Sequence, residues 1–281
     1  MKLDNGIISI DVVEHGAELK SAIKNSVEYM WCGDSKYWGR TSPVLFPFVG
    51  ALKDKKYLVD GQAYSMGQHG FARDCDFELL ENNDNSLTYI LKSNEETISK
   101  YPFDFTLTIK YTLLDSTIKV EWKVKNESDK VMSFSIGAHP AFNLREGDNY
   151  FRFDNKKDIT YNLIDENGLY VEDDRYILKN DGYVKIENTM FDNDALIIEN
   201  NQANEVSLCD SKKNAYITVR FNTPLFGLWS PAKKKAPFVC IEPWYGRCDR
   251  NDFRGEISQK DYIINIELGE TFKTEYEIEL L

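Results

Sequence analysis

The sequence predicts an all-β fold, an antiparallel β-sandwich or barrel with few short helices. The first reason is a period of two: apolar residues alternate with polar ones over 105–112 and again over 118–125, with a turn at Asp115-Ser116 between them. Such alternation is typical of strands with one buried face, here joined as a hairpin. The second reason is that many similar segments are separated by Asn, Asp and Gly turns with few helical periods between them, which argues against alternating strands and helices.

The remaining elements follow from the same patterns. A carboxyl-terminal hairpin is predicted over 262–268 and 272–280, with its turn at Gly269-Glu270. One helix is predicted over 93–101, because Ser93 and Glu96 have the spacing of a capping box and Pro102 ends it. The acidic polar stretch 145–182 is expected to form loops. Further strands are expected at 7–13, 87–92, 131–137, 206–209, 215–221 and 237–242.

The organisation predicted is a single domain over 1–281. The chain contains no internal repeat, no Pro/Ser-rich linker and no low-complexity tract that would mark a boundary. β-Sandwiches of this length commonly fold as one unit.

Charge and cysteine usage restrict the partners and the compartment. Lys and Arg number 34 against 46 Asp and Glu, and a formal charge of -12 repels nucleic-acid phosphates and anionic lipids. Neither nucleic acid nor a membrane is therefore an expected partner. The amino terminus lacks the continuous apolar run of a secretory signal, and no segment is apolar enough to span a bilayer. Five scattered cysteines without a CxxC pair argue against a disulfide framework or a zinc knuckle, so a cytoplasmic location is predicted.

Three histidines are the first candidates for chemistry. His15 follows the first predicted strand beside a glycine and is interpreted as a turn or surface residue. His69 lies between Gly67 and Gly70, where a structural turn and a functional role are equally compatible with the sequence. His139 ends a strand-like run at a point where functional sites are often built, although a lone histidine there is more often structural.

Glu242 is the carboxylate with the most unusual sequence context. It follows the apolar run 237–241 and precedes Pro243-Trp244-Tyr245-Gly246. Burying a carboxylate between an apolar strand and an aromatic loop is unfavourable unless it is hydrogen-bonded or used. A functional role is therefore favoured over a buried ion pair with an arginine.

Aromatic residues in the same segments suit the apolar faces of sugar rings, although most aromatic side chains are ordinary core. They are Trp38, Phe46, Phe48, Phe71, Phe142, Trp229, Trp244 and Tyr245. The chain lacks GxSxG, GxxxxGK[ST], strand-linked GxGxxG and HExxH motifs, which argues against serine hydrolase, nucleotide-binding and zincin chemistry. The three histidines are too far apart in sequence to form a recognisable metal signature.

Four segments together resemble the aldose 1-epimerase (galactose mutarotase) family, in its bacterial branch encoded near lactose and galactose genes. They are WGRTSPVLFPFVGALKD (38–54), QHGFARD (68–74), GAHPAFNL (137–144) and APFVCIEPWYG (236–246). Each motif alone is weak, but the four occur in the family's order, and the resemblance extends over essentially the whole chain. It implies a galactose mutarotase-like supersandwich that interconverts the anomers of a free aldohexose without metal or nucleotide.

The resemblance also implies the roles of individual residues. Glu242 matches the family's catalytic base, His139 its general acid, and His69 the histidine that holds the sugar near its ring oxygen. The family's Asn-Arg pair falls near Gly50-Ala51, so the substrate arginine is missing there, and Arg40, or less favoured Arg73, is expected to replace it. An acidic residue for the sugar hydroxyls corresponds to Asp192 or Asp194, and Trp229 is expected to stack on the sugar.

Two other functions remain compatible with the sequence. The same scaffold could act on hexose 6-phosphates, with Arg40 and Arg73 holding the phosphate. It could also be a carbohydrate-binding protein without catalysis, because a fold does not fix a function. Retention of both His139 and Glu242 counts against pure binding. The sequence indicates neither the sugar nor the oligomeric state.

Overall fold

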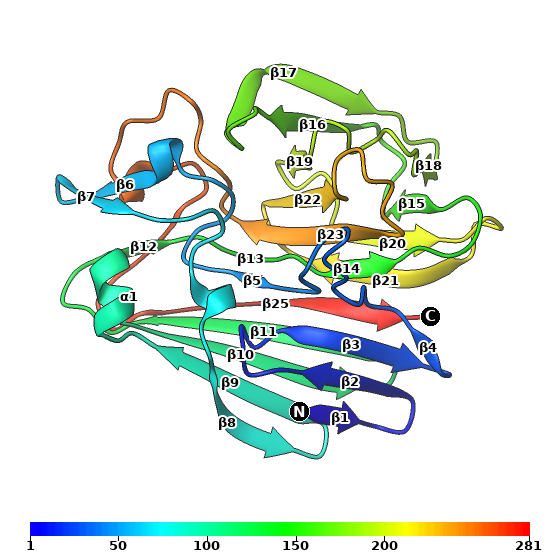
Figure 1. The fold of residues 1–281 in the computed structure, drawn as a ribbon, viewed down its shortest axis with the longest axis horizontal. Helices are drawn as coiled ribbons and strands as arrows, with labels where there is room; N and C mark the ends of the chain where they lie inside the picture. Colours follow the sequence, from blue (N-terminus) through cyan, green and yellow to red (C-terminus); the bar gives the residue numbers. More distant parts are fainter.

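A long antiparallel sheet forms one layer of the molecule in the computed structural model, which describes residues 1–281 except for the side chain of Asp174. Figure 1 shows this layer as the strands that cross the lower half of the view and continue behind its right side. Its hydrogen-bonded order is β18 (Val184–Lys185), β15 (Tyr150–Phe153), β20 (Glu205–Cys209), β21 (Ala215–Phe221), β25 (Thr271–Leu280), β11 (Thr117–Asn126), β10 (Phe105–Leu114), β9 (Ser86–Lys92) and β8 (Glu78–Asn83).

A second antiparallel sheet packs against the first and completes a sandwich. Its order is β17 (Tyr170–Leu178), β16 (Ile159–Ile164), β19 (Leu196–Glu199), β22 (Leu225–Trp229), β23 (Phe238–Tyr245), β13 (Ile136–Ala138) and β5 (Val44–Leu45), with β14 (Ala141–Asn143) also paired to β23. Phe226 of β22 joins the layers, because its ring lies 5.1 Å from that of Phe221 on β21 and 6.4 Å from that of Phe153 on β15. The all-β prediction is confirmed.

Smaller elements cover the sandwich. The antiparallel sheet β1 (Lys2–Asp4), β2 (Ile8–Val12), β3 (Leu19–Lys24) and β4 (Val27–Glu28) packs on the long sheet, where the Tyr89 and Tyr111 hydroxyls donate to the carbonyls of Val12 and Ala17. The other elements are the pairs β6 (Lys56–Val59) with β7 (Gln62–Ser65) and β12 (Met132–Phe134) with β24 (Ile264–Ile266), α1 (Glu95–Lys100), and the 3-10 turns η1 (Lys53–Lys55), η2 (Ala72–Asp74) and η3 (Ile257–Gln259). Among the described residues, no helix has the length and apolar character needed to cross a membrane.

The predicted hairpin around Asp115-Ser116 is confirmed. β10 and β11 pair from Phe105 opposite Asn126 to Leu114 opposite Thr117, and Asp115 adopts a positive φ of 51° in the turn. Every second residue of β10 is buried, as the period of two predicts. The other expected strands also form, with 131–137 divided into β12 and β13. The single-domain organisation stays a prediction.

The predicted carboxyl-terminal hairpin is wrong. β24 pairs with β12, whereas β25 pairs with β11 on one side and β21 on the other. Both hydrogen-bonding edges of β25 are thus occupied, so β24 has no edge of β25 available. Alternation correctly located the two strands but carried no information about their partners.

Two further expectations need correction. The stretch 145–182 contains β15, β16 and β17, not only loops. β17 pairs only with β16 and is largely exposed, so its polar composition is that of an edge strand. The helix is capped by Asn94 and Thr97 in place of Ser93 and Glu96, because Ser93 instead donates to the carboxylate of Asp104.

Gly70 tightly constrains the loop that presents His69. Its φ is +69°, and a Cβ atom there would lie 2.2 Å from the carbonyl oxygen of Phe46, with which Gly70 forms an isolated bridge. Any side chain therefore forces two backbone segments apart.

We predict that Gly70→Ala lowers the free energy of unfolding by at least about 2 kcal/mol, since it combines a positive φ with a backbone clash. Urea denaturation measures the change. Gly67→Ala is the matched control, because a Cβ atom there meets nothing within 4 Å. Equal stability of the two variants would contradict the prediction.

Candidate active site

Strand β23 places Glu242 on the outer face of its sheet. Val239 and Ile241 belong to the main core, so the alternate residues Cys240, Glu242 and Trp244 face the opposite side. β23 is buried along nearly its whole length and has β22 on one side and β13 with β14 on the other. Glu242 is consequently only 1% exposed and is held by a strand that is fixed on both edges.

His139 lies directly across from Glu242 because of strand register. Gly137 pairs with Trp244, and Ala141 pairs with Cys240. His139 is midway between Gly137 and Ala141, and Glu242 is midway between Cys240 and Trp244, so the two residues lie opposite each other. Directly opposed residues of antiparallel strands have adjacent side chains. The His139 Nε2 atom accordingly lies 3.3 Å from Glu242 Oε2.

Aromatic rings fix the orientation of His139. Trp38 stacks on the imidazole with a centroid distance of 4.7 Å, and Trp229 packs against it edge-on at 5.2 Å. The ring of His69 lies 5.7 Å away, nearly perpendicular to that of His139. The imidazole is buried, with 7% of the residue exposed, and has little freedom to change rotamer.

His69 is held in a defined tautomer by the backbone. Its φ is 67°, a conformation that glycine adopts readily and histidine tolerates better than most residues. Its Nδ1 accepts a hydrogen bond of 3.1 Å from the amide of Gly50. Because an accepting nitrogen carries no proton, the neutral ring bears its proton on Nε2. Burial, followed by the charges of His139, Arg73 and Arg40, lowers the pKa of His69 well below its usual value and keeps the ring neutral.

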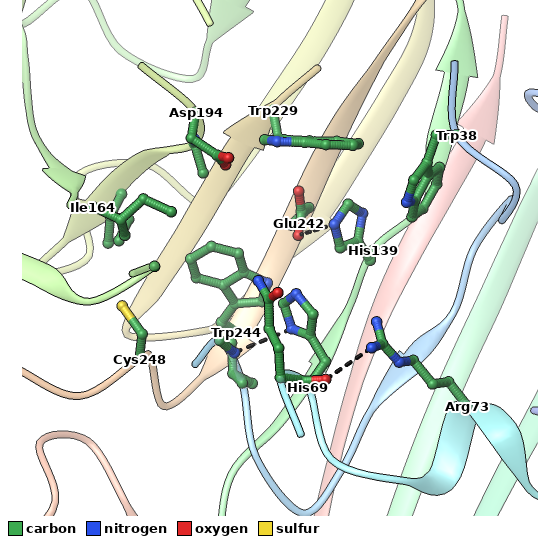
Figure 2. A pocket seen from close by; sticks show the side chains of 16 residues that line it. Trp38, His69, Arg73, His139, Ile164, Asp194, Trp229, Glu242, Trp244 and Cys248 are labelled. Carbon is green, nitrogen blue, oxygen red and sulfur yellow. Dashed lines mark hydrogen bonds and ion pairs between the residues drawn. The ribbon is translucent and has the colours of Figure 1, made fainter. Parts of the chain in front are cut away.

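These side chains line one cavity of about 230 Å³, smaller than the roughly 300–1,000 Å³ of pockets for drug-sized ligands. Figure 2 shows His139 and Glu242 side by side in its middle, below Trp229, with Arg73 and Asp194 toward opposite ends of the view. The labelled lining residues are Trp38, His69, Arg73, His139, Ile164, Asp194, Trp229, Glu242, Trp244 and Cys248.

Burial opposes charge on both members of the central pair. It raises the pKa of Glu242 well above 4.5, with a further contribution from Asp194, and the nearby Trp244 indole opposes the shift. Burial also lowers the pKa of His139 to about 3; its own backbone opposes this shift, and Arg73 and Arg40 add to it. The pair therefore favours a neutral carboxylic acid beside a neutral imidazole over an ion pair.

Several polar atoms of the cavity have no hydrogen-bond partner among the described residues. They are both carboxyl oxygens of Glu242, His139 Nδ1, Arg73 Nε and the indole nitrogen of Trp244. Buried polar atoms are nearly always paired, and exceptions are common where a ligand supplies the partner. The cavity thus offers donors and acceptors arranged around one small polar molecule.

The structure distinguishes between the paired candidates from the sequence. Arg73 lines the cavity and donates to the carbonyl of Gln68, whereas Arg40, the favoured candidate, lies outside it in a 2.6 Å ion pair with Asp74. Asp194 lines the cavity, whereas Asp192 does not and instead borders, together with Asp194, a depression that adjoins it.

Sequence reasoning missed part of the lining. Ile164 and Gly168 belong to the stretch expected to form only loops, and Cys248 follows the aromatic motif without any chemical signal of its own. Trp38 and Trp244 carried an aromatic signal, but nothing in the sequence separated them from core residues. Trp244 and Ile164 lie on strands of the second sheet, and Trp38, Gly168 and Cys248 lie on loops, so only the folded chain brings these five together.

Comparison with known proteins identifies the family of the chain. The family model for aldose 1-epimerase matches residues 1–264. The chromosomal and plasmid LacX proteins of Lactococcus lactis subsp. lactis are each 31% identical to the chain, covering 100% of it and 99% of the relative.

Solved structures show the same fold. A galactose mutarotase related enzyme from Lactobacillus acidophilus superimposes with a TM-score of 0.94 at 33% identity, covering 100% of this chain and 97% of that one. A galactose mutarotase-like protein from Lactobacillus casei gives a TM-score of 0.94 at 28% identity, covering 100% and 99%. The chain therefore belongs to the aldose 1-epimerase family and is an isomerase of the mutarotase type.

Proposed function

We propose that the protein interconverts the α and β anomers of a free aldohexose by acid/base ring opening and closure. The observation that carries the proposal is the placement of His139 Nε2 and Glu242 Oε2 3.3 Å apart in one cavity lined by tryptophans. Family membership supports the reaction class, and the site supplies the groups it needs.

The reaction requires two proton transfers on opposite sides of one carbon atom. Glu242 as carboxylate takes the proton of the C1 hydroxyl, while His139 as imidazolium gives a proton to the ring oxygen. The C1–O bond of the ring breaks, and C1 becomes the carbonyl carbon of the open aldehyde. Rotation about C1–C2 presents the other face, and reversal of both transfers closes the ring as the other anomer.

His139 and Glu242 together carry one proton before and after ring opening, as the cycle of opening and closure requires. Before ring opening the proton is on His139, and afterwards the net result is a proton on Glu242 and a neutral His139. The second arrangement is the one that burial favours. A bound sugar would stabilise the first, because its hydroxyl donates to the carboxylate and its ring oxygen accepts from the imidazolium. The two states are thereby brought closer in free energy.

The other residues orient the sugar. The Nε2–H of His69 and the guanidinium of Arg73 are donors near the ring oxygen, and Asp194 accepts from hydroxyls at the other end. Trp229 and Trp38 offer apolar faces to the C–H groups of the ring. Holding the substrate in one pose contributes to the rate by fixing the reacting atoms beside the acid and the base.

A hexose 6-phosphate is the second candidate substrate, and the position of Arg73 favours it. Other charges oppose it. Asp74 lies 3.7 Å from Arg73 Nε and forms the ion pair with Arg40, so it offsets both cations. The depression that adjoins the cavity is bordered by Asp165, Glu166, Asp192 and Asp194 against the single cation Lys233. These charges favour a neutral sugar.

Glu242→Gln and His139→Asn are each predicted to lower kcat by at least about 10²-fold, the contribution of one positioned acid or base. Polarimetry or NMR of freshly dissolved α-glucose and α-galactose measures the rate. Glu78→Gln, an exposed carboxyl away from the cavity, is the control. Full activity in a folded Glu242→Gln protein would remove the assignment of Glu242 as the base, whereas a wild type without activity would leave a carbohydrate-binding role.

The same substitution has a predicted effect on stability. The pKa of Glu242 is raised on folding, so stability falls as pH rises from the unfolded pKa through the folded one. Glutamine does not titrate and escapes this loss. The melting temperature of Glu242→Gln relative to wild type is therefore expected to be higher at pH 8 than at pH 5. A difference independent of pH, as expected for Glu78→Gln, would contradict the raised pKa.

Glucose 6-phosphate is predicted to compete with α-glucose more weakly than galactose does, because the acidic border repels the phosphate. The inhibition constants are compared in the polarimetric assay at low and high salt. If the two inhibition constants become more similar at high salt, the repulsion of the phosphate is electrostatic. Stronger competition by the phosphate, lost in Arg73→Met, would establish the sugar phosphate as the substrate.

A further inference from the structure

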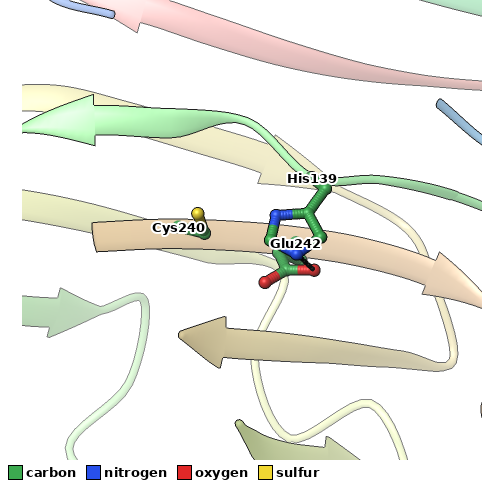
Figure 3. Close-up of side chains that lie close together, drawn as sticks. All are labelled: His139, Cys240 and Glu242. Carbon is green, nitrogen blue, oxygen red and sulfur yellow. Dashed lines mark ion pairs between the residues drawn. The ribbon is translucent and has the colours of Figure 1, made fainter. Parts of the chain in front are cut away.

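Cys240 lies beside the catalytic pair but takes no part in the acid/base scheme. It is two residues before Glu242 on β23 and therefore shares its face of the strand. Figure 3 shows the His139 imidazole over Glu242 and to one side of Cys240. One potential ligand atom from each of these three residues lies within 4.8 Å of the other two. All three residues are buried, and Cys240 is 0% exposed.

The cluster has the donor atoms of a transition-metal site. Imidazole, thiolate and carboxylate are the ligands that Zn²⁺ binds, and three protein ligands with one open position are typical of its reactive sites. Mg²⁺ and Ca²⁺ prefer sets of oxygen ligands and do not suit a thiol and an imidazole. These donors therefore favour Zn²⁺ or a similar transition-metal ion over Mg²⁺ and Ca²⁺.

Two observations indicate that the geometry suits an ion. Both carboxyl oxygens of Glu242 are buried without a hydrogen-bond partner among the described residues, so carboxylate lone pairs are available inside the cluster. Nitrogen and oxygen ligands at 2.0–2.1 Å from a tetrahedral Zn²⁺ are about 3.4 Å apart. The 3.3 Å between His139 Nε2 and Glu242 Oε2 matches that edge.

We propose that His139, Cys240 and Glu242 form an inhibitory site for Zn²⁺ or a similar divalent transition-metal ion. The inhibitory effect rests on the proposed function, because the ion occupies the lone pairs that the proton transfers use. The fourth position faces the cavity, where the sugar would otherwise bind, so inhibition is competitive with the sugar.

The exchange balances charge without adding any to the buried cluster. Before binding, the thiol holds one proton and the pair of His139 and Glu242 holds another, for a net charge of zero. On binding, both protons leave to solvent, and Zn²⁺ is coordinated by thiolate, carboxylate and neutral imidazole, again for a net charge of zero. A dication replaces two protons, which avoids the large penalty for burying net charge.

The test compares wild type, Cys240→Ser and Cys240→Ala in chelator-treated buffer, each against its own uninhibited rate of α-glucose mutarotation. Cys209→Ser is the matched control, since its thiol is also buried but lies on β20 in the other sheet. Relative to wild type, the Zn²⁺ inhibition constant is expected to rise at least about tenfold in both Cys240 variants and to stay unchanged in Cys209→Ser. Equal inhibition of all four proteins would overturn the proposal.

Co²⁺ provides a readout that does not depend on activity. Wild type and Cys209→Ser titrated with Co²⁺ are expected to show a thiolate-to-metal charge-transfer band in the near ultraviolet that the Cys240 variants lack. The absence of this band in wild type would overturn the metal site even if the enzyme is an epimerase. A band in a protein without epimerase activity would preserve the site and reject the proposed function.

Discussion

The proposed chemistry depends on one juxtaposition, that of the Glu242 carboxyl and the His139 imidazole, which are only 1% and 7% exposed. Burial disfavours the charged form of each group, and their 3.3 Å separation lets the pair hold a single proton in either of two positions. In water the same groups would ionise independently near their ordinary pKa values. Burial in the fold therefore shifts the two pKa values in opposite directions, each toward the neutral group.

The sandwich maintains that juxtaposition through strand register. β23 is paired on both edges, so neither Glu242 nor its opposite residue is free to slide. Its two faces have separate functions: Val239 and Ile241 pack in the core, while Glu242 and Trp244 on the opposite face line the cavity. A shift of one residue would bury the wrong set on each face, so stability of the core and geometry of the site are enforced by the same pairing.

Sequence reasoning predicted what is local and missed what depends on pairing. Alternation located β10 and β11 together with their partnership, because a short turn joins them. The same signal located β24 and β25 but not their partners, since β25 lies between β11 and β21. Likewise, the context of Glu242 marked it as unusual, but the choice between Arg40 and Arg73 depends on η2 and on the ion pair with Asp74, which no spacing along the chain reveals.

The unpaired polar atoms of the cavity link stability to chemistry. Each buried oxygen or nitrogen without a partner destabilises the folded state, since it loses hydrogen bonds to water on folding. A protein selected for stability alone would pair them or replace Glu242 by an apolar residue. Because these unpaired atoms are retained in a well-packed sheet, the packing of the core must offset the free energy that they cost the folded state. In the two proposals the same lone pairs accept protons from a sugar and bind a metal ion, so the proposed reactivity and the proposed metal inhibition have one physical cause.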